Sequence, residues 1–312
     1  HRLTEMEEKA MIDSELRRHL SGVFTALVTP FRDGAIDVSA LERLIAAQLE
    51  AGVAGLVPVG TTGEAATLSE AEADEVIRIT VAAAKGRAFI MAGTGSNATA
   101  LAVAKAKRAE ALGADGILVV TPYYNKPSQD GLFAHFSAIA EAVRIPIMLY
   151  SVPGRTGVEI APATAARLAK AYPHIVAIKE AGGRTERITE LRRALGEDFV
   201  IHSGDDGLTL PFLAVGADGV TSVASNLLPR EIVALCAAWA KGELREARRI
   251  HQALFDVTGH LFIESNPVPV KTALARSGAI SAEVRAPLAP LRPENLKALE
   301  ASLAAFESAR DI

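Results

Sequence analysis

Eight short apolar runs, separated by Ala-rich stretches, constrain the fold of this chain more than any other feature of its sequence. Most of these runs are continuously apolar rather than alternating, which is typical of strands buried on both faces of a parallel sheet. Successive runs start roughly 20 to 33 residues apart, the length needed for a strand, a loop and a crossover helix. They start near Val23, Gly55, Ala88, Gly116, Ile145, Ile175, Phe199 and Gly219.

A repeated glycine pattern supports this alternation of helix and strand. The segments "EAGVAGLVPV", "ALGADGILVV" and "AVGADGVTSV" each carry Gly-x-x-Gly before an apolar run. The first glycine is suited to end a helix in the left-handed conformation, and the second to open a strand. Ser69 and Glu72 have the spacing of a capping box at the start of a further helix. The sequence therefore predicts an α/β fold, a closed (β/α)8 TIM barrel.

The helical sequence after the eighth run extends the chain beyond the barrel. We expect the last barrel helix at 229–240, and the remaining sequence reads as helical with no linker-like change in composition. We predict a charged helical leader at 1–20, the barrel at 21–241 and a C-terminal helical appendage at 242–312.

Composition narrows the classes of partner. The chain has 33 Lys and Arg against 37 Asp and Glu, a net charge of −4, so no basic footprint for nucleic acid is present. No apolar run approaches the roughly 18 residues of a membrane span. The single cysteine, Cys236, excludes an internal disulfide framework and suits a reducing cytoplasm. We expect a cytoplasmic protein that acts on small molecules.

Lys179 is the most unusual residue among the strand ends, where a barrel of this kind carries its active site. Alternation places it on the same face as Ala177 and Ile175, with Glu180 turned the other way. If that face is the barrel interior, desolvation disfavours the charged ammonium and frees a lone pair for attack on a ketone. The position alone fits equally well a lysine that extends to solvent.

Other strand ends carry polar residues, and each of them could have either a functional or a purely structural role. The Tyr150 phenol could shuttle protons or simply pack in the core. Thr61 and Thr62, between glycines, could hold a carboxylate or form a plain turn. Arg155 could bind a second carboxylate or form a structural ion pair.

Two further motifs could indicate a metal site and a nucleotide site, but neither is complete. Asp205 and Asp206 are possible metal ligands, but the seven histidines include no HxH or HExxH spacing, so we expect no metal. The run from Gly93 through Gly95 to Ala98 resembles a dinucleotide fingerprint. The acidic residue expected about 20 positions later is missing, so we interpret the run as the start of a helix.

Taken in order, the motifs resemble the dihydrodipicolinate synthase and N-acetylneuraminate lyase family of class I, pyruvate-dependent aldolases. The resemblance extends from about Gly22 to the C-terminal helices. It is carried by "VTPF", "GTTGEAATLS", "AGTGSNATA", "TPYYNKPSQDGL", "LYSVPGRTG", "AIKEA", "SGDD" and "NPVPVK". The combination is specific, whereas each motif alone is weak.

The resemblance implies roles for individual residues. Lys179 would form an imine with pyruvate, and Tyr150 would transfer protons through Thr62 to Tyr124, which reaches into a neighbouring subunit. Thr61 and Thr62 match the positions that hold the pyruvate carboxylate. The remaining substrate positions implied by the resemblance are Arg155 for the carboxylate of the aldehyde, the Gly204 carbonyl and Thr221. It further implies a homotetramer built from tight dimers and no cofactor.

Within the family, Arg155 and the tyrosine pair favour the branch that condenses pyruvate with aspartate 4-semialdehyde to 4-hydroxy-tetrahydrodipicolinate, on the route to lysine. A lyase or dehydratase of a 2-keto-3-deoxy sugar acid or of N-acetylneuraminate, working through the same imine, is the first alternative. A non-enzymatic sugar-acid-binding barrel and a nucleotide-binding oxidoreductase are the more distant ones.

The sequence departs from the synthase pattern at several positions. Ser151 replaces an Asn, and Thr221 replaces a branched aliphatic residue, both at positions expected near the substrate pocket. Leu101 and Ala73 stand where lysine-inhibited relatives carry an acid and a histidine. We therefore expect weak or absent inhibition by lysine.

Overall fold

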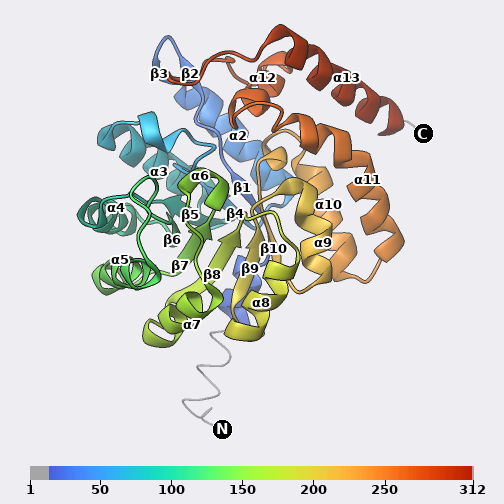
Figure 1. The fold of residues 1–312 in the computed structure, drawn as a ribbon. Coiled ribbons are helices and arrows are strands. Elements are labelled where there is room, and N and C mark those ends of the chain that lie inside the picture. Colours follow the sequence, from blue (N-terminus) through green and yellow to red (C-terminus); the bar gives the residue numbers. More distant parts are fainter. Residues whose placement is uncertain (1–13, 311–312) are drawn as a thin grey trace.

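A closed barrel of parallel strands forms the centre of the molecule (Figure 1). The computed structural model describes residues 14–310. In this part of the chain the strand order is β1-β10-β9-β8-β7-β6-β5-β4, with β1 pairing to β4 to close the barrel. The predicted (β/α)8 barrel is confirmed. Its strands are β1 (Gly22–Ala26), β4 (Gly55–Val57), β5 (Phe89–Gly93), β6 (Gly116–Val120), β7 (Ile147–Ser151), β8 (Ile175–Glu180), β9 (Val200–Ser203) and β10 (Gly219–Ser222).

Helices surround the barrel, as Figure 1 shows. They are α2 (Val38–Ala51), α3 (Glu70–Ala84), α4 (Thr99–Ala111), α5 (Gln129–Ala142), α6 (Pro153–Thr156), α7 (Pro162–Ala171), α8 (Glu186–Leu195), α9 (Thr209–Ala214) and α10 (Pro229–Ala240). Short 3-10 helices also follow three strands: η1 (Ala65–Thr67), η2 (Asp206–Leu208) and η3 (Ala224–Asn226). The capping box at Ser69 and Glu72 is present at the start of α3, so that prediction is confirmed.

A hairpin that the sequence analysis missed lies between β1 and α2. Strands β2 (Phe31–Arg32) and β3 (Ala35–Ile36) pair antiparallel around Asp33 and Gly34, both with positive φ. An Asp-Gly pair between two short runs is the sequence signal of such a turn.

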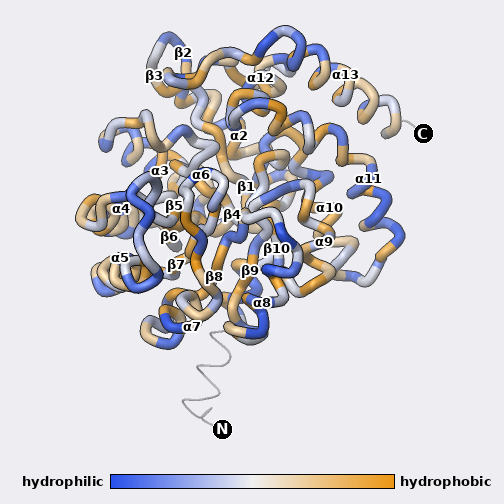
Figure 2. The backbone as a smooth tube through the Cα atoms, in the orientation of Figure 1, coloured by the Kyte–Doolittle hydropathy of each residue, from blue (hydrophilic) through white to orange (hydrophobic). Residues whose placement is uncertain are grey.

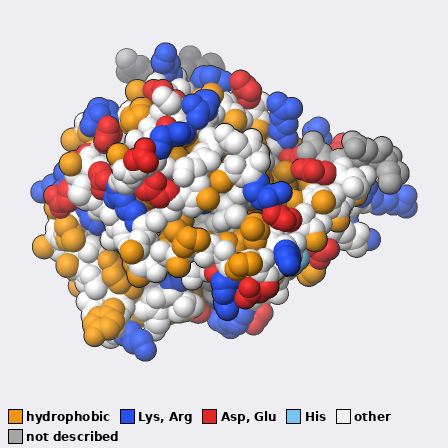
Figure 3. Space-filling view, turned by 90° about the horizontal axis from the view of Figure 1, so that it is seen from above, with side chains coloured by type: hydrophobic (Ala, Val, Ile, Leu, Met, Phe, Trp, Pro, Cys, Tyr) orange, Lys and Arg blue, Asp and Glu red, His pale blue; other side chains and the backbone are white. Residues whose placement is uncertain are grey.

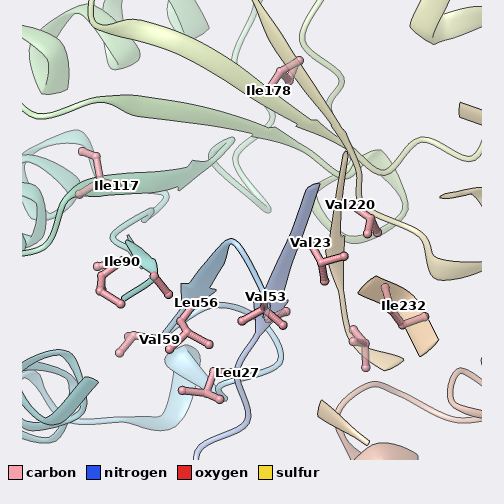
Figure 4. Packing of buried hydrophobic residues seen from close by; sticks show 14 of the residues in the cluster. Val23, Leu27, Val53, Leu56, Val59, Ile90, Ile117, Ile178, Val220 and Ile232 are labelled. Carbon is pink, nitrogen blue, oxygen red and sulfur yellow. The ribbon is translucent and has the colours of Figure 1, made fainter. Parts of the chain in front are cut away.

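Two apolar layers hold the barrel together, one outside the strands and one inside. The outer layer packs strands against helices, and Figure 4 shows part of it, including Leu56, Ile117 and Ile178. In Figure 2 the apolar colour accordingly concentrates on the central strands. The inner layer fills the barrel. Its members are Leu20, Phe24, Val57, Met91, Leu118, Met148, Tyr150, Val152, Ala177 and Val200.

A β-bulge at the start of β8 corrects one detail of the predicted register. The pairing with β7 shifts between Ile147 and Met148, so that Ile147 faces Ile175 and Met148 faces Ala177. Ile175 consequently lies in the outer apolar layer, not on the face of Ala177 as strict alternation predicts.

The repeated glycines act as the sequence analysis predicted. Gly52, Gly113 and Gly216, which follow helices, all have positive φ. The second glycine of each pair permits close packing at a strand start. At Gly219 a Cβ would collide with the backbone of Gly22 on β1. Glycine is therefore required where β10 closes against β1.

The C-terminal helices α11 (Leu244–His260), α12 (Val268–Arg276) and α13 (Pro293–Arg310) lie along one side of the barrel (Figure 1). Helix α11 packs on α10 and α13. At the other end of the chain, residues 14–20 are helical, and residues 1–13 of the predicted leader lie outside the described residues. The division of the chain at 20 and 241 stays a prediction.

The surface mixes charges of both signs. On the face drawn in Figure 3, Lys and Arg side chains are interspersed with Asp and Glu. None of the helices within residues 14–310 has the length and apolar character needed to span a bilayer.

Candidate active site

A cavity of about 400 Å³ opens at the carboxyl ends of the barrel strands. Strand ends of β4 to β7 form one part of its wall, and the C-terminal segment forms another. The cavity lies where barrel enzymes place their active sites. Its lining includes Thr61, Gly93, Leu118, Val120, Tyr150, Arg155, Asn266 and Pro287.

Lys179 lies inside the barrel and not in solvent. Its side chain is only 5% exposed, and its Nζ is 4.2 Å from the centre of the Tyr150 ring, a member of the inner apolar layer. Lys179 is paired in register with Tyr150 on β7 and with His202 on β9. Of the two readings left open by the sequence, the structure shows the buried lysine and not one that extends to solvent.

The acid next to Lys179 belongs to the outer layer. Glu180 is fully buried and accepts hydrogen bonds from Arg187 Nε at 3.2 Å and from the Gly182 N–H at 2.8 Å. Burial raises the pKa of Glu180, and the Arg187 guanidinium opposes that rise. Because Glu180 is held on the far side of the strand, it is not a counter-ion for Lys179.

Tyr150 connects the lysine to the cavity. It lines the cavity, is 6% exposed and packs its ring beneath the lysine amine. Its phenol ring is therefore placed beside the Lys179 amine, as a proton-transfer group requires.

The two threonines of the β4 loop occupy different environments. Thr61 is half-buried and lines the cavity. Thr62 is 2% exposed, and its Oγ1 accepts a hydrogen bond from Asn266 Nδ2 at 2.9 Å. Within the described residues, the structure gives no hydrogen bond between Thr62 and Tyr150. Thr61 is thus the hydroxyl that faces the cavity.

Arg155 stands at the outer part of the cavity, in the short helix α6. Its guanidinium donates to the Asn266 carbonyl at 3.3 Å and otherwise faces the cavity. A guanidinium so placed offers a two-pronged donor to a carboxylate.

Tyr124 points away from the site of its own chain. It is 90% exposed and has a positive φ of 74°. The structure therefore does not bring Tyr124 together with Tyr150 and Thr62 inside one subunit.

Gly204, which follows β9, and Thr221, on β10, lie outside the lining of the cavity. A Cβ at Gly204 would come within 3.1 Å of Lys179 Cε, so glycine leaves room for the lysine chain. Thr221 is 1% exposed, and its Oγ1 is 3.0 Å from His202 Nδ1.

Asp205 and Asp206 have structural roles. Asp206 accepts a hydrogen bond from the Ser222 hydroxyl. It also accepts from the N–H groups of Val223 and Ala224, both at 2.9 Å, and so caps the turn after β10. Asp205 accepts from the Gly207 N–H at 2.9 Å. Both carboxylates are occupied by the turns that follow β9 and β10.

Ser151 and the run from Gly93 to Ala98 were both expected to have particular places at the strand ends. Ser151 does not lie in the pocket, contrary to expectation. It faces outward, because Tyr150 faces inward, and its Oγ accepts from the Ile160 N–H at 3.3 Å. The Gly93 to Ala98 run does open helix α4, and a Cβ at Gly93 would collide with the Val59 backbone.

Sequence reasoning missed the contribution of the C-terminal segment to the site. Asn266 is 6% exposed and joins Thr62 to Arg155, and Lys271 forms a buried ion pair of 2.6 Å with Glu64, two residues after Thr62. The motif "NPVPVK" contains both Asn266 and Lys271, so the signal was present without a stated role.

Comparison with known proteins gives one consistent result. The model of the dihydrodipicolinate synthetase family matches residues 19–306. The 4-hydroxy-tetrahydrodipicolinate synthase of Pelobacter propionicus is 52% identical over 270 residues, which cover 86% of this chain and 93% of that protein.

Solved structures agree with this. The 4-hydroxy-tetrahydrodipicolinate synthase of Methylacidiphilum fumariolicum has a TM-score of 0.91 and 52% identity, covering 92% of this chain and 96% of that chain. The chloride-inhibited dihydrodipicolinate synthase of Acinetobacter baumannii, described as complexed with pyruvate, has a TM-score of 0.89 and 43% identity over 92% of this chain and 99% of that chain. With its barrel, its enclosed lysine and these relatives, this chain belongs to the dihydrodipicolinate synthetase family.

Proposed function

We propose that this protein condenses pyruvate with aspartate 4-semialdehyde to give 4-hydroxy-tetrahydrodipicolinate. The observation that carries the proposal is Lys179, enclosed in the barrel with its Nζ 4.2 Å from the ring centre of Tyr150 at the inner end of the cavity. An amine kept out of water is suited to attack a carbonyl carbon. The relatives' names and the arginine at the outer part of the cavity support the choice of substrates.

The first half of the reaction activates pyruvate. Lys179 Nζ attacks C2 of pyruvate, and the carbinolamine loses water to form a protonated imine. This cation withdraws electrons, so a proton leaves the methyl carbon and an enamine results. We assign these proton transfers to Tyr150, which is the phenol beside the amine.

The second half forms the carbon–carbon bond. The enamine carbon attacks the aldehyde carbon of the semialdehyde, and the aldehyde oxygen takes up a proton. The amino group of the semialdehyde then displaces Lys179 from C2, which closes the ring and frees the lysine. The whole reaction releases the one water lost at the imine step.

The cavity wall supplies the binding groups. We propose that the β4 loop, through Thr61 and Thr62, holds the pyruvate carboxylate, and that Arg155 holds the carboxylate of the aldehyde. Asn266 donates to the Thr62 oxygen, which leaves the Thr62 hydroxyl proton free, and we propose that Thr62 carries protons between Tyr150 and the Tyr124 of a neighbouring copy. Gly204 contributes its carbonyl, and Thr221 contributes its backbone and side chain near the imine.

We further propose that the protein assembles into a homotetramer of tight dimers. Tyr124 is 90% exposed, and Tyr123 and Leu101 are also exposed large side chains. An exposed tyrosine at the edge of the cavity mouth is suited to complete the proton path of a neighbouring copy.

A substrate panel tests the proposed reaction. Steady-state rates are compared for condensation of pyruvate with aspartate 4-semialdehyde and for cleavage of N-acetylneuraminate and 2-keto-3-deoxy sugar acids. We expect the condensation to be fastest by kcat/KM. The matched variant Arg155→Lys keeps the charge but loses the two-pronged geometry, so it should raise KM for the semialdehyde more than for pyruvate. Faster cleavage of a sugar acid would instead make the protein a lyase.

A further inference from the structure

A polar pair interrupts the apolar interior of the barrel beside Lys179. His202 on β9 is fully buried and Thr221 on β10 is 1% exposed. The ring of His202 packs edge-on against Phe24 of the inner layer, with 5.1 Å between ring centres. Buried polar groups are costly unless they are hydrogen-bonded. Here both ring nitrogens have partners.

His202 and Thr221 belong to a chain of hydrogen bonds that ends at the backbone carbonyl of Leu20, and this carbonyl fixes the direction of the chain. His202 Nε2 is 2.6 Å from the carbonyl oxygen of Leu20, which can only accept. Nε2 therefore carries the proton, and burial lowers the pKa of His202 to about 4, so the ring is neutral near neutral pH. Nδ1 is then an acceptor, and Thr221, at 3.0 Å, donates its hydroxyl proton to it.

With its proton committed to His202, the Thr221 oxygen can only accept a further hydrogen bond. The chain runs from Thr221 to His202 to Leu20, with every donor pointing toward Leu20. Such aligned hydrogen bonds polarise one another, which concentrates negative charge on the free end. That free end is the Thr221 oxygen.

The strand register places the Thr221 side chain near the level of Lys179 in the barrel interior. Lys179 pairs with His202, and His202 pairs with Gly219, so Thr221 lies one inward step closer to the cavity. At that level β9 contributes Gly204, which has no side chain, and the Lys179 chain runs past it. Thr221 is therefore the next inward side chain across β9 from Lys179.

No carboxylate competes for this place among the described residues. Glu180 is held in the outer layer by Arg187. The charged groups that act on His202 are Lys179 and Asp218, and Asp218 is paired with Arg17 and Arg192 at 2.9 Å and 2.8 Å.

We infer that His202 and Thr221 are positioning residues that favour the imine over the free amine at Lys179. The inference rests on the proposed imine chemistry. An amine attacks a carbonyl through its free lone pair, whereas the protonated imine that results carries a positive charge and an N–H. An oxygen that can only accept stabilises the second state more than the first. His202 acts through Thr221, because it holds the hydroxyl proton away from the lysine.

The test measures imine formation in variants of Thr221. Thr221→Val removes the oxygen at nearly constant volume, and Thr221→Ser retains it. The imine is trapped with borohydride over a range of pyruvate concentrations and counted by intact mass. We expect the half-saturating pyruvate concentration to rise about tenfold in Thr221→Val, equivalent to about 1.4 kcal/mol. Thr221→Ser should restore it, and KM for the aldehyde should stay unchanged in both.

Two controls separate this role from a structural one. Thr272→Val removes a hydroxyl that bonds only within its own helix, at 2.8 Å from the Val268 carbonyl, and should trap like the wild type. In a His202→Leu background, Thr221→Val should have a smaller effect, because the hydroxyl is no longer oriented. Wild-type trapping behaviour in Thr221→Val would overturn the inference. Absence of trapping in the wild-type protein would instead overturn the proposed function.

Discussion

At the scale of single residues, the chemistry depends on which of two neighbours on β8 faces the barrel interior. Lys179 faces inward beside Tyr150, and Glu180 faces outward to Arg187. If the register slipped by one residue, the acid would enter the site and the lysine would leave it. The β-bulge at Ile175 lies before this pair, so strand β8 keeps its alternation from Ala177 onward.

Inhibition by lysine should be weak because of the side chains at positions 101 and 105. Leu101 and Lys105 are one helical turn apart on α4, and Lys105 lines the cavity. Burial lowers the pKa of Lys105, the positive charge of Arg108 lowers it further, and Glu70 opposes both. A cationic inhibitor would meet an apolar side chain and a like charge there. Initial rates measured over micromolar to millimolar lysine should stay flat, and a half-maximal effect at submillimolar lysine would contradict this.

Two buried histidines should make stability depend on pH. Burial lowers the pKa of His135 and of His202 from 6.5 to about 4. Between pH 6.5 and about pH 4, these histidines bind protons in the unfolded chain but not in the folded chain. The free energy of unfolding therefore falls as pH drops from 6.5 to 4, by at most about 3 kcal/mol per histidine.

Variants isolate this effect from the carboxyl groups that titrate in the same range. His135→Gln should reduce the difference in unfolding free energy between pH 6.5 and 4.5, measured by denaturant titration. His19→Gln, at an exposed position, should leave that difference unchanged. An equal pH dependence in all three proteins would refute the assignment.

Sequence patterns located the candidate reactive residues better than the residues that support them. Alternation and strand ends, which are local properties, marked Lys179 and Tyr150 as candidates, and the family resemblance implied their roles. The partners Asn266 for Thr62 and Leu20 for His202 lie 204 and 182 residues away along the chain. Contacts of that kind depend on closure of the barrel, so no local pattern reveals them.

At the scale of elements, the C-terminal segment is part of the active-site wall. Asn266 and Pro287 line the cavity, and Lys271 on α12 reaches Glu64 in the β4 loop. Arg285 strengthens the same junction between the C-terminal segment and the β4 loop. Its backbone N–H donates to Glu64 at 2.9 Å, and its side chain binds Glu72. The barrel strands were predictable from their apolar runs, whereas no local pattern indicated that the β4 loop and helix α12 would meet.

Breaking the buried ion pair should destabilise the fold. Lys271 is 0% exposed, and its Nζ is 2.6 Å from Glu64. Lys271→Met leaves a buried carboxylate without its cation, so we expect a loss of about 3–5 kcal/mol in the free energy of unfolding. Adding Glu64→Gln should recover part of that loss.

The matched control is an exposed ion pair on the neighbouring helix α11. Arg249→Met removes the pair with Glu246, at 2.7 Å, and should leave the unfolding midpoint unchanged because exposed pairs contribute little. A Lys271→Met protein as stable as this control would show that the buried pair does not hold the junction.

At the scale of the whole molecule, the proposed tetramer would make the exposed Tyr124 part of an active site shared between copies of the chain. The barrel itself provides Lys179, Tyr150 and Arg155 from a single chain. Tyr124 is the one proposed catalytic residue whose side chain faces away. Fold prediction from spacing cannot reveal such an arrangement, because the partner surface belongs to a second molecule.

Mixing two inactive variants tests this sharing. Lys179→Arg lacks the imine-forming amine, and Tyr124→Ala lacks the tyrosine offered to a partner. After reversible dissociation and reassembly, mixed dimers contain one site with both residues intact, so activity should partly return. Each variant treated alone serves as the control. No recovery, with mixed oligomers verified by native mass spectrometry, would place Tyr124 outside the neighbour's site.

A covalent bond between Lys179 and pyruvate underlies the proposed reaction, and mass spectrometry of the borohydride-reduced protein can detect it. We expect one adduct of reduced pyruvate per chain, located on the peptide that contains Lys179 and absent in Lys179→Arg. An adduct on another lysine, or none at any pyruvate concentration, would contradict it.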